Sequence, residues 1–302
     1  MTIDSLLAGL KARDPRTIGR AISLVENGDE KAEAILASLD EELVDKATIL
    51  GITGPPGAGK STLTNSIISR LRQDGKRIGI VAVDPSSPIS GGAILGDRVR
   101  MMQHATDPDV IMRSMATRGR LGGLCATAGA AVRIMASCGC SLIIIETVGV
   151  GQSEMDIIRL ADITLLVLAP GLGDDIQAMK AGLLEVADIL VVNKADCKGA
   201  DILAMDLEAV TRKGKVHPAQ VCMTVATESK GIGELLNRIE RVDSEHRSSG
   251  ERHKRRREAH DQEVLDWCLE MLRPRLMEAI SRRELPLRGD PRLKAKRILA
   301  EQ

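Results

Sequence analysis

The sequence of 302 residues has no phenylalanine and no tyrosine, and Trp267 is its single aromatic residue. This lack removes stacking aromatics from a ligand pocket and most of the aromatic anchors that are common at protein interfaces. Leu, Ile and Met must fill the core instead, and such flexible side chains can pack irregular gaps. A hydrophobic fraction of 43% still allows a sizeable core, in one large domain with appendages or in two small ones.

An excess of charge of one sign is also missing, because 42 Lys and Arg residues balance 42 Asp and Glu residues. There is no overall basic field to attract nucleic acid, so we expect no nucleic-acid partner. No apolar run approaches the roughly 20 residues of a membrane-spanning helix, and no signal peptide precedes the first expected helix. We therefore expect a cytoplasmic protein without membrane contact, or a mitochondrial matrix protein if a transit peptide has been removed.

The six cysteines lack the paired spacing of a metal site. Cys138-Gly139-Cys140 comes nearest to such a motif, but no histidine and no second cysteine pair accompanies it in the sequence. Small buried thiols in a reducing compartment are the favoured interpretation.

What the sequence does contain is a complete phosphate-binding loop, G-x-x-x-x-G-K-S, at residues 54–61. An apolar run, 48–52, precedes it and a stretch with helical spacing, 62–68, follows it, which is the strand–loop–helix context that this motif requires. The backbone N–H groups of such a loop point inward to a phosphate at a helix N-terminus. Lys60 would reach the β- and γ-phosphates, and the Ser61 hydroxyl would hold Mg²⁺. The predicted nucleotide ligands here are Gly54, Pro55, Pro56, Gly57, Ala58, Gly59, Lys60, Ser61 and Thr62.

A second motif, Asn193-Lys194-Ala195-Asp196, follows the apolar run 189–192. The Asp196 carboxylate can accept hydrogen bonds from N1–H and from the exocyclic amine of guanine, whereas adenine would leave the carboxylate unpaired at a cost. Asn193 is expected to tie the loop together, and the stem of Lys194 to lie along the base. The sequence therefore predicts GTP and GDP as the bound nucleotides.

Six apolar, β-branched segments alternate with helical ones between residues 46 and 242, as expected of strands that are buried on both faces. The predicted strands are 49–53, 78–83, 142–146, 164–168, 189–192 and 221–225. We predict an α/β fold of the P-loop NTPase type, with a doubly wound, mainly parallel sheet and ligands at the carboxyl ends of the strands. We expect an N-terminal helical extension, 1–45, and a C-terminal helical arm, 243–302, to flank this predicted GTPase domain, 46–242.

Helix signals mark both extensions. Asp14-Pro15 predicts the start of a capped helix that stops at Asn27-Gly28. The charged stretch 244–260 is interpreted as a solvated helix or linker, in preference to a nucleic-acid or lipid patch. Apolar residues then recur at helical spacing over 264–280, with a kink or break expected at Pro274. This amphipathic tail needs a partner surface, in its own core or in a second subunit.

Acidic residues occur where the chemistry of a bound triphosphate needs them, because Mg²⁺ prefers carboxylate oxygens. Asp84 and Glu146 end predicted strands, and Asp97 lies in a glycine-rich loop. Glu146 fits the Walker-B arrangement, a carboxylate at the end of a buried strand beside the phosphate loop. Gly149 can offer its backbone N–H to the γ-phosphate. Val150 follows it and cannot orient water as a glutamine would, so we expect slow intrinsic hydrolysis until a partner completes the site.

Glycine-punctuated loops at 91–92, 149–151 and 171–173 are predicted to order around the γ-phosphate and Mg²⁺ and to relax when these leave. The alternative interpretation is that they are ordinary tight turns. Three arginines between predicted strands are candidates to neutralise transition-state charge, although salt-bridged arginines are commoner. They are Arg113, Arg118 and Arg120.

Residues 146–154, Glu-Thr-Val-Gly-Val-Gly-Gln-Ser-Glu, resemble the MeaB/ArgK-type GTPases, the metallochaperones of cobalamin-dependent acyl-CoA mutases. Further matching blocks occur in order through nearly the whole central domain, whereas the helical ends match by layout only. These blocks are 84–87, 91–97, 113–119 with 121–123, 170–177 and 193–196.

The resemblance implies a homodimer in which the helical C-terminal arm reaches the other subunit. It implies that GTP state gates the delivery of adenosylcobalamin to a mutase, such as methylmalonyl-CoA mutase, and ejects inactivated cofactor. A switch loop at about 170–180 would relay the nucleotide state to the mutase.

The resemblance also implies roles for single residues. The Mg²⁺ ligands map to Ser61, Asp84, Asp97 and Glu146. Lys180 becomes a candidate contact to the nucleotide site, so the catalytic candidates are Lys60, Glu146 and Lys180. A second guanine-side loop maps to Val225 and Ala226.

Two other functions are compatible with a phosphate loop. One is a kinase that transfers the γ-phosphate to a small molecule or protein, such as an amino-acid transport kinase, but no acceptor pocket or acid placed as a base is visible. The other is a GTPase that inserts a metal ion into another enzyme; such proteins tend to carry His- or Cys-rich ligands, whereas the 5 histidines here are scattered. The leading prediction is a GTPase that converts GTP to GDP and phosphate.

Overall fold

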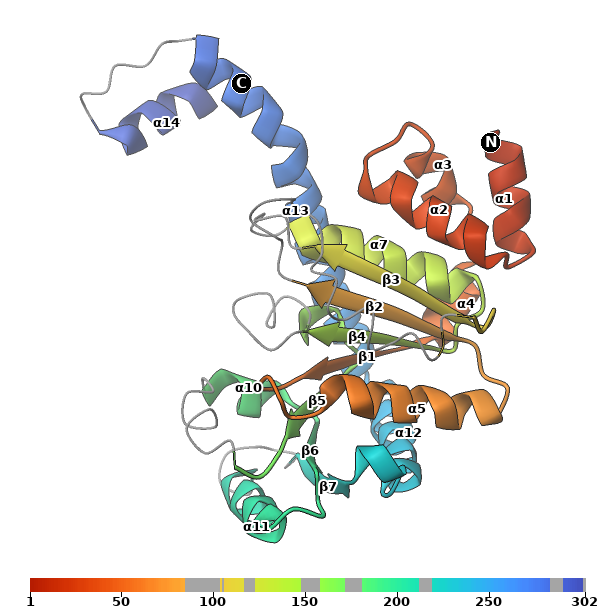
Figure 1. Ribbon diagram of the computed structural model, residues 1–302. Helices are drawn as coiled ribbons and strands as arrows, with labels where there is room; N and C mark the ends of the chain where they lie inside the picture. Colours follow the sequence, from red (N-terminus) through yellow and green to blue (C-terminus); the bar gives the residue numbers. More distant parts are fainter. Residues whose placement is uncertain are drawn as a thin grey trace.

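The computed structural model describes residues 1–84, 104, 106–116, 123–147, 158–171, 181–211, 219–282 and 290–300. Within these ranges the centre is a seven-stranded, fully parallel sheet with the order β3-β2-β4-β1-β5-β6-β7 (Figure 1). The strands are β1 (Thr48–Thr53), β2 (Ile78–Asp84), β3 (Val110–Ala116), β4 (Leu142–Thr147), β5 (Ile163–Leu168), β6 (Ile189–Asn193) and β7 (Gln220–Thr224). All six predicted strands are present within one residue at each end.

Strand β3, which pairs with β2 at one edge of the sheet, was not predicted from the sequence. Arg113 and Ser114 interrupt its apolar run, and a strand at an edge can carry such polar residues because it has one neighbour instead of two. The guanidinium of Arg113 pairs with Glu26, the last residue of helix α2 (Pro15–Glu26). Arg113 is therefore salt-bridged, which agrees with the alternative interpretation given above.

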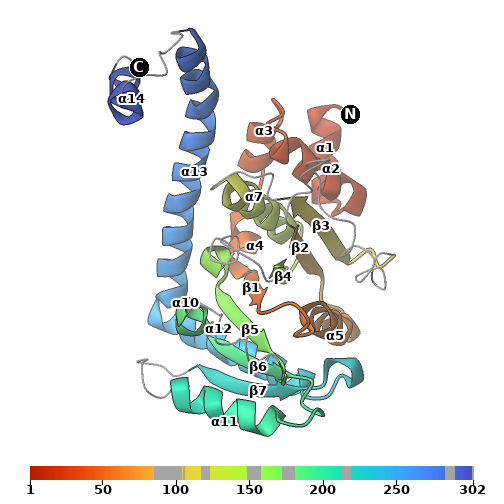
Figure 2. The same cartoon turned by 60° about the vertical axis from the view of Figure 1, so that its left-hand side comes forward.

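Helices cover both faces of the sheet, which confirms the doubly wound α/β fold (Figures 1 and 2). They are α5 (Lys60–Gln73), α7 (Gly123–Ser137), α10 (Ala181–Val186), α11 (Ala200–Thr211) and α12 (Ile232–Ser249). On one face, α5 and α12 share a core with alternate strand residues such as Leu165; on the other, α10 and α11 share a core that includes Leu166. The strands are apolar throughout because both of their faces are buried.

The N-terminal helices form an outer layer on α7. They are α1 (Ile3–Lys11), α2, α3 (Ala32–Ala37) and α4 (Glu41–Lys46). As predicted, Asp14 caps α2 and accepts a 2.8 Å hydrogen bond from the Thr17 N–H, with Pro15 in the first helical position. Ile18 and Ile22 of α2 are buried in the same core as α7. The predicted domain boundaries at residues 45 and 242 stay predictions.

The last two helices that the structure describes are α13 (Glu251–Arg282) and α14 (Pro291–Leu299). Helix α13 has 32 residues and continues through Pro274, so the chain does not break there. A proline inside a helix costs about 3 kcal/mol, which the many other turns of so long a helix can offset. The first half of α13 lies along the domain, and its second half projects away with α14 beside it (Figure 2).

The charged stretch 244–260 is mainly helical and mostly exposed, as predicted, but one row of arginines at the start of α13 turns into the domain, which the prediction did not include. Arg252 is only 4% exposed and binds the Asp243 carboxylate at 2.8 Å. Arg256 binds both oxygens of Asp162 at 2.7 and 2.8 Å. Both guanidinium groups also donate to the carbonyl oxygen of Ala47. The partners that bury these arginines lie far away in the sequence, so the local pattern of charges did not reveal them.

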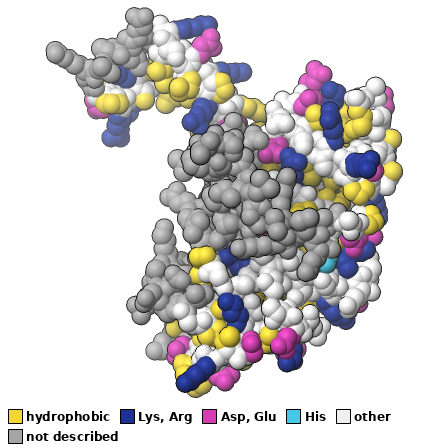
Figure 3. Space-filling view, viewed as in Figure 1, with side chains coloured by type: hydrophobic (Ala, Val, Ile, Leu, Met, Phe, Trp, Pro, Cys, Tyr) yellow, Lys and Arg dark blue, Asp and Glu magenta, His cyan; other side chains and the backbone are white. Residues whose placement is uncertain are grey.

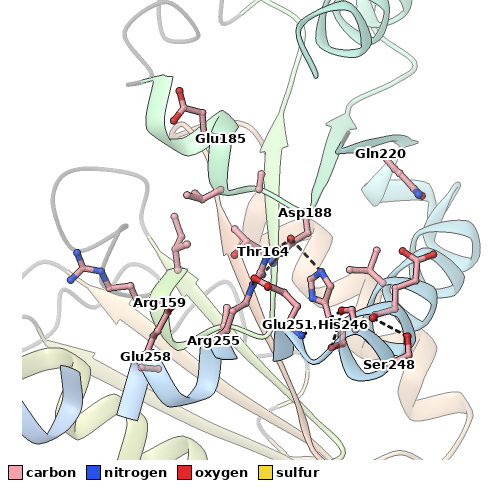
Figure 4. Close-up of a pocket in the computed structure, with 18 of the residues that line it drawn as sticks. Arg159, Thr164, Glu185, Asp188, Gln220, His246, Ser248, Glu251, Arg255 and Glu258 are labelled. Carbon is pink, nitrogen blue, oxygen red and sulfur yellow. Dashed lines mark hydrogen bonds and ion pairs between the residues drawn. The ribbon is translucent and has the colours of Figure 1, made fainter. Parts of the chain in front are cut away.

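Arg255 of the same stretch lines a groove between α10, α12 and α13 (Figure 4). Its guanidinium binds both carboxylate oxygens of Asp188 at 2.8 and 2.9 Å, and Nε2 of His246 lies 3.7 Å from the same carboxylate. Asp188 precedes β6, whereas Asn193 ends it. The groove therefore lies at the amino ends of the strands, whereas the predicted nucleotide site lies at their carboxyl ends.

Candidate nucleotide-binding site

The phosphate loop joins the end of β1 to the start of α5, and three of its glycines adopt conformations that favour glycine. The φ angles of Gly54, Gly57 and Gly59 are 143°, 81° and 90°. A Cβ atom on Gly54 would lie 2.1 Å from the carbonyl oxygen of Val167, and one on Gly59 would lie 2.3 Å from Nδ2 of Asn193. The loop is therefore seated tightly against β5 and against the end of β6.

Lys60 opens α5, and its side chain folds back over the loop. The residue is 7% exposed, and Nζ donates to the carbonyl oxygens of Gly54 and Pro55 at 2.7 and 3.1 Å. These carbonyl groups offset part of the cost of burying an ammonium group. The N-terminus of the 14-residue helix α5 adds further positive potential. Positive charge thus gathers where the triphosphate is expected.

Ser61 and Glu146 meet directly beside the loop. The Ser61 hydroxyl donates a 2.6 Å hydrogen bond to Oε1 of Glu146, although the two residues are 85 positions apart. Strand β4 brings them together, because it runs beside β1 with Glu146 opposite Ile52. Glu146 is 5% exposed. The hydroxyl and carboxylate that the sequence assigns to Mg²⁺ are therefore neighbours.

Asp84 lies at the carboxyl end of β2, the strand beside β4. The preceding residue, Val83, is paired with Thr147, so the backbone of Asp84 reaches the edge where Glu146 lies. Four predicted parts of the site lie outside the described side chains: the carboxylate of Asp84, and Asp97, Gly149 and Lys180. Among the side chains that the structure does describe, no three His, Cys, Asp or Glu residues form a group that could hold a metal ion.

Other predictions also fall outside the described residues. These are the loop glycines at 91–92 and 149–151, Val150, Arg118 and Arg120, and most of the proposed switch loop, 172–180. Their roles stay predictions.

Asn193, at the end of β6, connects the phosphate loop to the guanine-side loops. Its Nδ2 donates to the carbonyl oxygen of Ala58 at 3.0 Å. Its Oδ1 accepts from the hydroxyl of Thr224 at 3.1 Å and from the N–H of Ala226 at 3.2 Å. Asn193 is 2% exposed, so all of these bonds are shielded from water. The side chain occupies the joining position that the sequence predicts.

The turn after Asn193 leaves Lys194 and Asp196 exposed. Lys194 adopts a φ of 56°, and its carbonyl oxygen accepts from the N–H of Cys197 at 2.9 Å. The N–H of Ala195 donates to the carbonyl oxygen of Thr224 at 3.0 Å. The Asp196 carboxylate is thus presented to solvent on an anchored turn, as recognition of a base requires.

The second predicted guanine-side loop follows β7. Val225 and Lys230 exchange two backbone hydrogen bonds of 3.1 and 3.2 Å, which close the loop. The hydroxyl of Ser66 in α5 donates to the carbonyl oxygen of Ala226 at 2.6 Å. Neither Thr224 nor Ser66 was predicted as part of the site. Thr224 could have been found from its place directly before the loop, whereas nothing in the sequence marks Ser66.

Comparison with known proteins identifies the family. Residues 18–282 match the sequence model of the family described as "Methylmalonyl Co-A mutase-associated GTPase MeaB". The chain belongs to the MeaB family of GTPases. The match includes the phosphate loop, both guanine-side loops and the whole of α13, which confirms the resemblance found in the sequence.

Individual relatives agree with this MeaB-family assignment. A Pyrococcus abyssi protein that is named as a GTPase is 48% identical over 272 residues, which cover 87% of this chain and 82% of the relative. The Mus musculus protein named methylmalonic aciduria type A homolog, mitochondrial, is 33% identical over 281 residues, which cover 85% of this chain and 67% of the relative.

A solved structure titled LAO/AO transport system kinase is similar to the MeaB-family chain, with a TM-score of 0.68 and 24% identity. The similarity covers 99% of this chain and 97% of that one, and it shows a shared fold. As for membranes, none of the helices in the described ranges has both the length and the apolar content of a membrane span.

Proposed function

We propose that this MeaB-family GTPase binds GTP with Mg²⁺ and hydrolyses it to GDP and phosphate. The cycle gates the loading of adenosylcobalamin into a cobalamin-dependent acyl-CoA mutase, such as methylmalonyl-CoA mutase, and protects or reactivates that enzyme. One observation carries the nucleotide part: Ser61 and Glu146 are hydrogen-bonded at 2.6 Å beside a phosphate loop that Asn193 joins to the Asp196 turn. The family description and the name of the mouse relative support the mutase as the partner.

In this proposal the chain's own donors bind the triphosphate. The Lys60 ammonium exchanges its contacts with two loop carbonyls for the β- and γ-phosphate oxygens, and the N–H groups of the loop point at the phosphates. The N–H of Gly149 and the side chain of Lys180 add contacts on the γ-phosphate side.

Ser61 and Glu146 fit a Mg²⁺ ion, because a hydroxyl and a carboxylate are hard oxygen ligands and these two already touch. Asp84 and Asp97 are the further acidic groups of the proposed set. When bound, the ion neutralises charge on the β- and γ-phosphate oxygens. Hydrolysis by the isolated protein is slow in this proposal, because Val150 cannot orient water.

Guanine selectivity rests on Asp196, whose carboxylate accepts from N1–H and the exocyclic amine. Asn193 holds the Asp196 turn and the Val225–Ala226 loop at a constant distance from the phosphate loop. The loops that bind the base and the loop that binds the phosphates are then connected to one another by hydrogen bonds.

The proposal includes a homodimer that forms through α13. From residue 264 onward this helix leaves large apolar side chains 41% to 67% exposed, and apolar side chains are visible on the projecting arm (Figure 3). They are Val264, Leu265, Leu269, Met271, Leu272, Met277 and Ile280. Large exposed apolar side chains gathered on one segment often mark an interaction site, and a second copy can cover them with the same segment.

The test of the nucleotide chemistry measures free phosphate released from GTP and from ATP, with Mg²⁺ and without any acceptor. We expect phosphate and GDP in equal amounts from GTP and little from ATP. Glu146→Gln should lower the rate by about 100-fold or more, as loss of a charge-stabilising group does. Asp196→Asn should move the preference to xanthosine triphosphate, because an amide donor matches the 2-oxo group. Phosphate that appears only on an added acceptor would favour a kinase instead.

The test of the partner is a pull-down with purified cobalamin-dependent mutases, in GDP and in a non-hydrolysable GTP analogue. A complex whose amount depends on the nucleotide supports the chaperone function. Absence of binding in both states would refute that part and leave the nucleotide chemistry standing.

A further inference from the structure

The backbone of Ala226 is held on both sides by side chains from other elements. Its N–H donates to Oδ1 of Asn193 at 3.2 Å, and its carbonyl oxygen accepts from the Ser66 hydroxyl at 2.6 Å. Asn193 in turn binds the phosphate loop at Ala58, and Ser66 lies in α5, the helix that this loop opens. The contacts form a closed circuit that runs from the phosphate loop to the guanine-side loop and back.

We infer that Ser66 is a positioning residue for guanine selectivity. Its hydroxyl fixes the loop at Val225 and Ala226 relative to the phosphate loop, so that a base and its phosphates are read in one geometry. The inference rests on the proposed function, in which that loop faces the base. Ser66 acts through Ala226 and is not itself a ligand.

The hydrogen bond between Ser66 and Ala226 should stabilise the loop at residues 225–226 more than it stabilises helix α5. Leu63, Ile67 and Ile68 of α5 are 0% exposed in the central core, so the helix is anchored without the Ser66 hydroxyl. Ala226, by contrast, is 4% exposed; its carbonyl oxygen accepts from the Ser66 hydroxyl at 2.6 Å and from the N–H of Ser229, inside the same loop, at 3.3 Å, so Ser66 provides the hydrogen bond that ties this group to another element. Loss of the hydroxyl leaves a buried carbonyl group without this partner, which shifts or loosens the loop.

The experiment measures dissociation constants with Mg²⁺ for GTP and for 6-thioguanosine triphosphate, which keeps the N1–H and exocyclic amine that Asp196 binds but has sulfur, a weaker acceptor, in place of the 6-oxo oxygen. Ser66→Ala should weaken GTP binding about three- to tenfold, the loss expected for one hydrogen bond, and should weaken binding of the analogue less than twofold. Ser66→Thr keeps a hydroxyl and should stay within twofold of the wild type for both. Ser69→Ala is the matched control, since Ser69 is half-buried one turn later and its hydroxyl faces His104 at 3.4 Å.

Equal weakening of both nucleotides by Ser66→Ala would overturn the inference, because a role at the base must distinguish them. A lowered unfolding temperature with unchanged nucleotide preference would also overturn it and would leave Ser66 a structural residue. Failure of the wild-type protein to bind GTP is a separate result, which refutes the proposed function beneath the inference.

Discussion

The two halves of α13 differ in a way that their residue types do not suggest: the first buries charged side chains, and the second leaves apolar side chains exposed. In the first half, Arg252 is 4% exposed and Arg256 is bound to Asp162, which is itself 1% exposed. In the second half, Leu269 and Met271 are 55% and 67% exposed. The residue types alone would assign the charged half to solvent and the apolar half to the core. What decides burial here is which partner groups the rest of the molecule offers to each half.

At the amino ends of the strands, carboxylate and carbonyl oxygens accept hydrogen bonds from the arginines in the first half of α13. The planar guanidinium group binds such acceptors in a fixed fork, which is why arginine and not lysine suits these positions. Burial lowers the pKa of the Arg252 guanidinium, although Asp162 and Asp243 act in the opposite direction. Lys254 and Arg257, on the other side of the helix, stay exposed.

The largest effect is expected from removing the charge that the first half depends on. Asp162→Asn should lower the free energy of unfolding by about 3 kcal/mol, because it leaves buried arginines without their counter-charge. Urea unfolding followed by circular dichroism measures this. Glu278→Gln is the matched control on the same helix: Glu278 pairs with Arg282 in solvent and should contribute less than about 0.5 kcal/mol. Equal stability of the two variants would contradict the contrast between buried and exposed charges.

A smaller loss is expected midway along the helix, where Arg133 of α7 binds both oxygens of Glu263 at 2.5 and 2.7 Å. Arg133→Met should cost about 2 kcal/mol, since Glu263 is buried and would lose its partner. The double variant Arg133→Met with Glu263→Met should recover at least half of the loss, because an apolar pair replaces the ion pair. Urea unfolding of the three proteins measures the coupling, and additive losses would show that the pair does not act as a unit.

The dependence of stability on pH offers a further test of the difference between buried and exposed side chains, because the protein has both buried and exposed cysteine thiols. Burial raises the pKa of the Cys138 thiol to about 11 and that of Cys140 to about 12, from an ordinary 9.0, whereas Cys268 in the projecting half of α13 is exposed. A folded-state pKa above the unfolded value means stability that is complete below about pH 9 and is lost as the pH rises through the folded values.

Unfolding free energies at pH 8 and pH 10 should therefore differ by about 1 kcal/mol or more in favour of pH 8. The variant Cys138→Ala with Cys140→Ala should show a smaller difference, and Cys268→Ala should match the wild type. If all three proteins respond alike to pH, the buried thiols are not the cause.

The smallest effect on stability is expected in the second half of α13. Leu269→Asp should change the free energy of unfolding of the monomer by less than about 0.5 kcal/mol, because the side chain is 55% exposed. The same change should weaken self-association about tenfold or more if a second copy covers this face, as sedimentation equilibrium would show. A marked loss of monomer stability would mean that the face packs within the chain after all.

The elements that were predicted correctly are those whose residues form a recognisable pattern along the chain. Strands buried on both faces read as apolar runs, so six of them were located within one residue. Strand β3 was missed because Arg113 interrupts its run, and the partner of Arg113, Glu26, lies 87 residues earlier. Of the kink or break expected at Pro274, the break does not occur, because α13 continues through this residue.

The candidate site divides in the same way. The glycines and Lys60 of the phosphate loop were found from their spacing, because a loop that wraps a phosphate needs those residue types in that order. The pairing of Ser61 with Glu146 was expected only as a shared role, and its contact depends on β4 lying beside β1. Ser66 could not have been found at all, because a serine inside a helix has many roles and no local signal separates them.

By itself the sequence determined the phosphate loop, the guanine motif, the α/β class and the MeaB family, because each of these is written in residues that are adjacent along the chain. The tertiary structure alone decided which charges are buried and which apolar side chains remain outside. Arg256 and Asp162 are 94 residues apart, and neither carries a local sign of the other. The physical reason is that a side chain is stabilised by whatever surrounds it after folding, and chain order does not state what that will be.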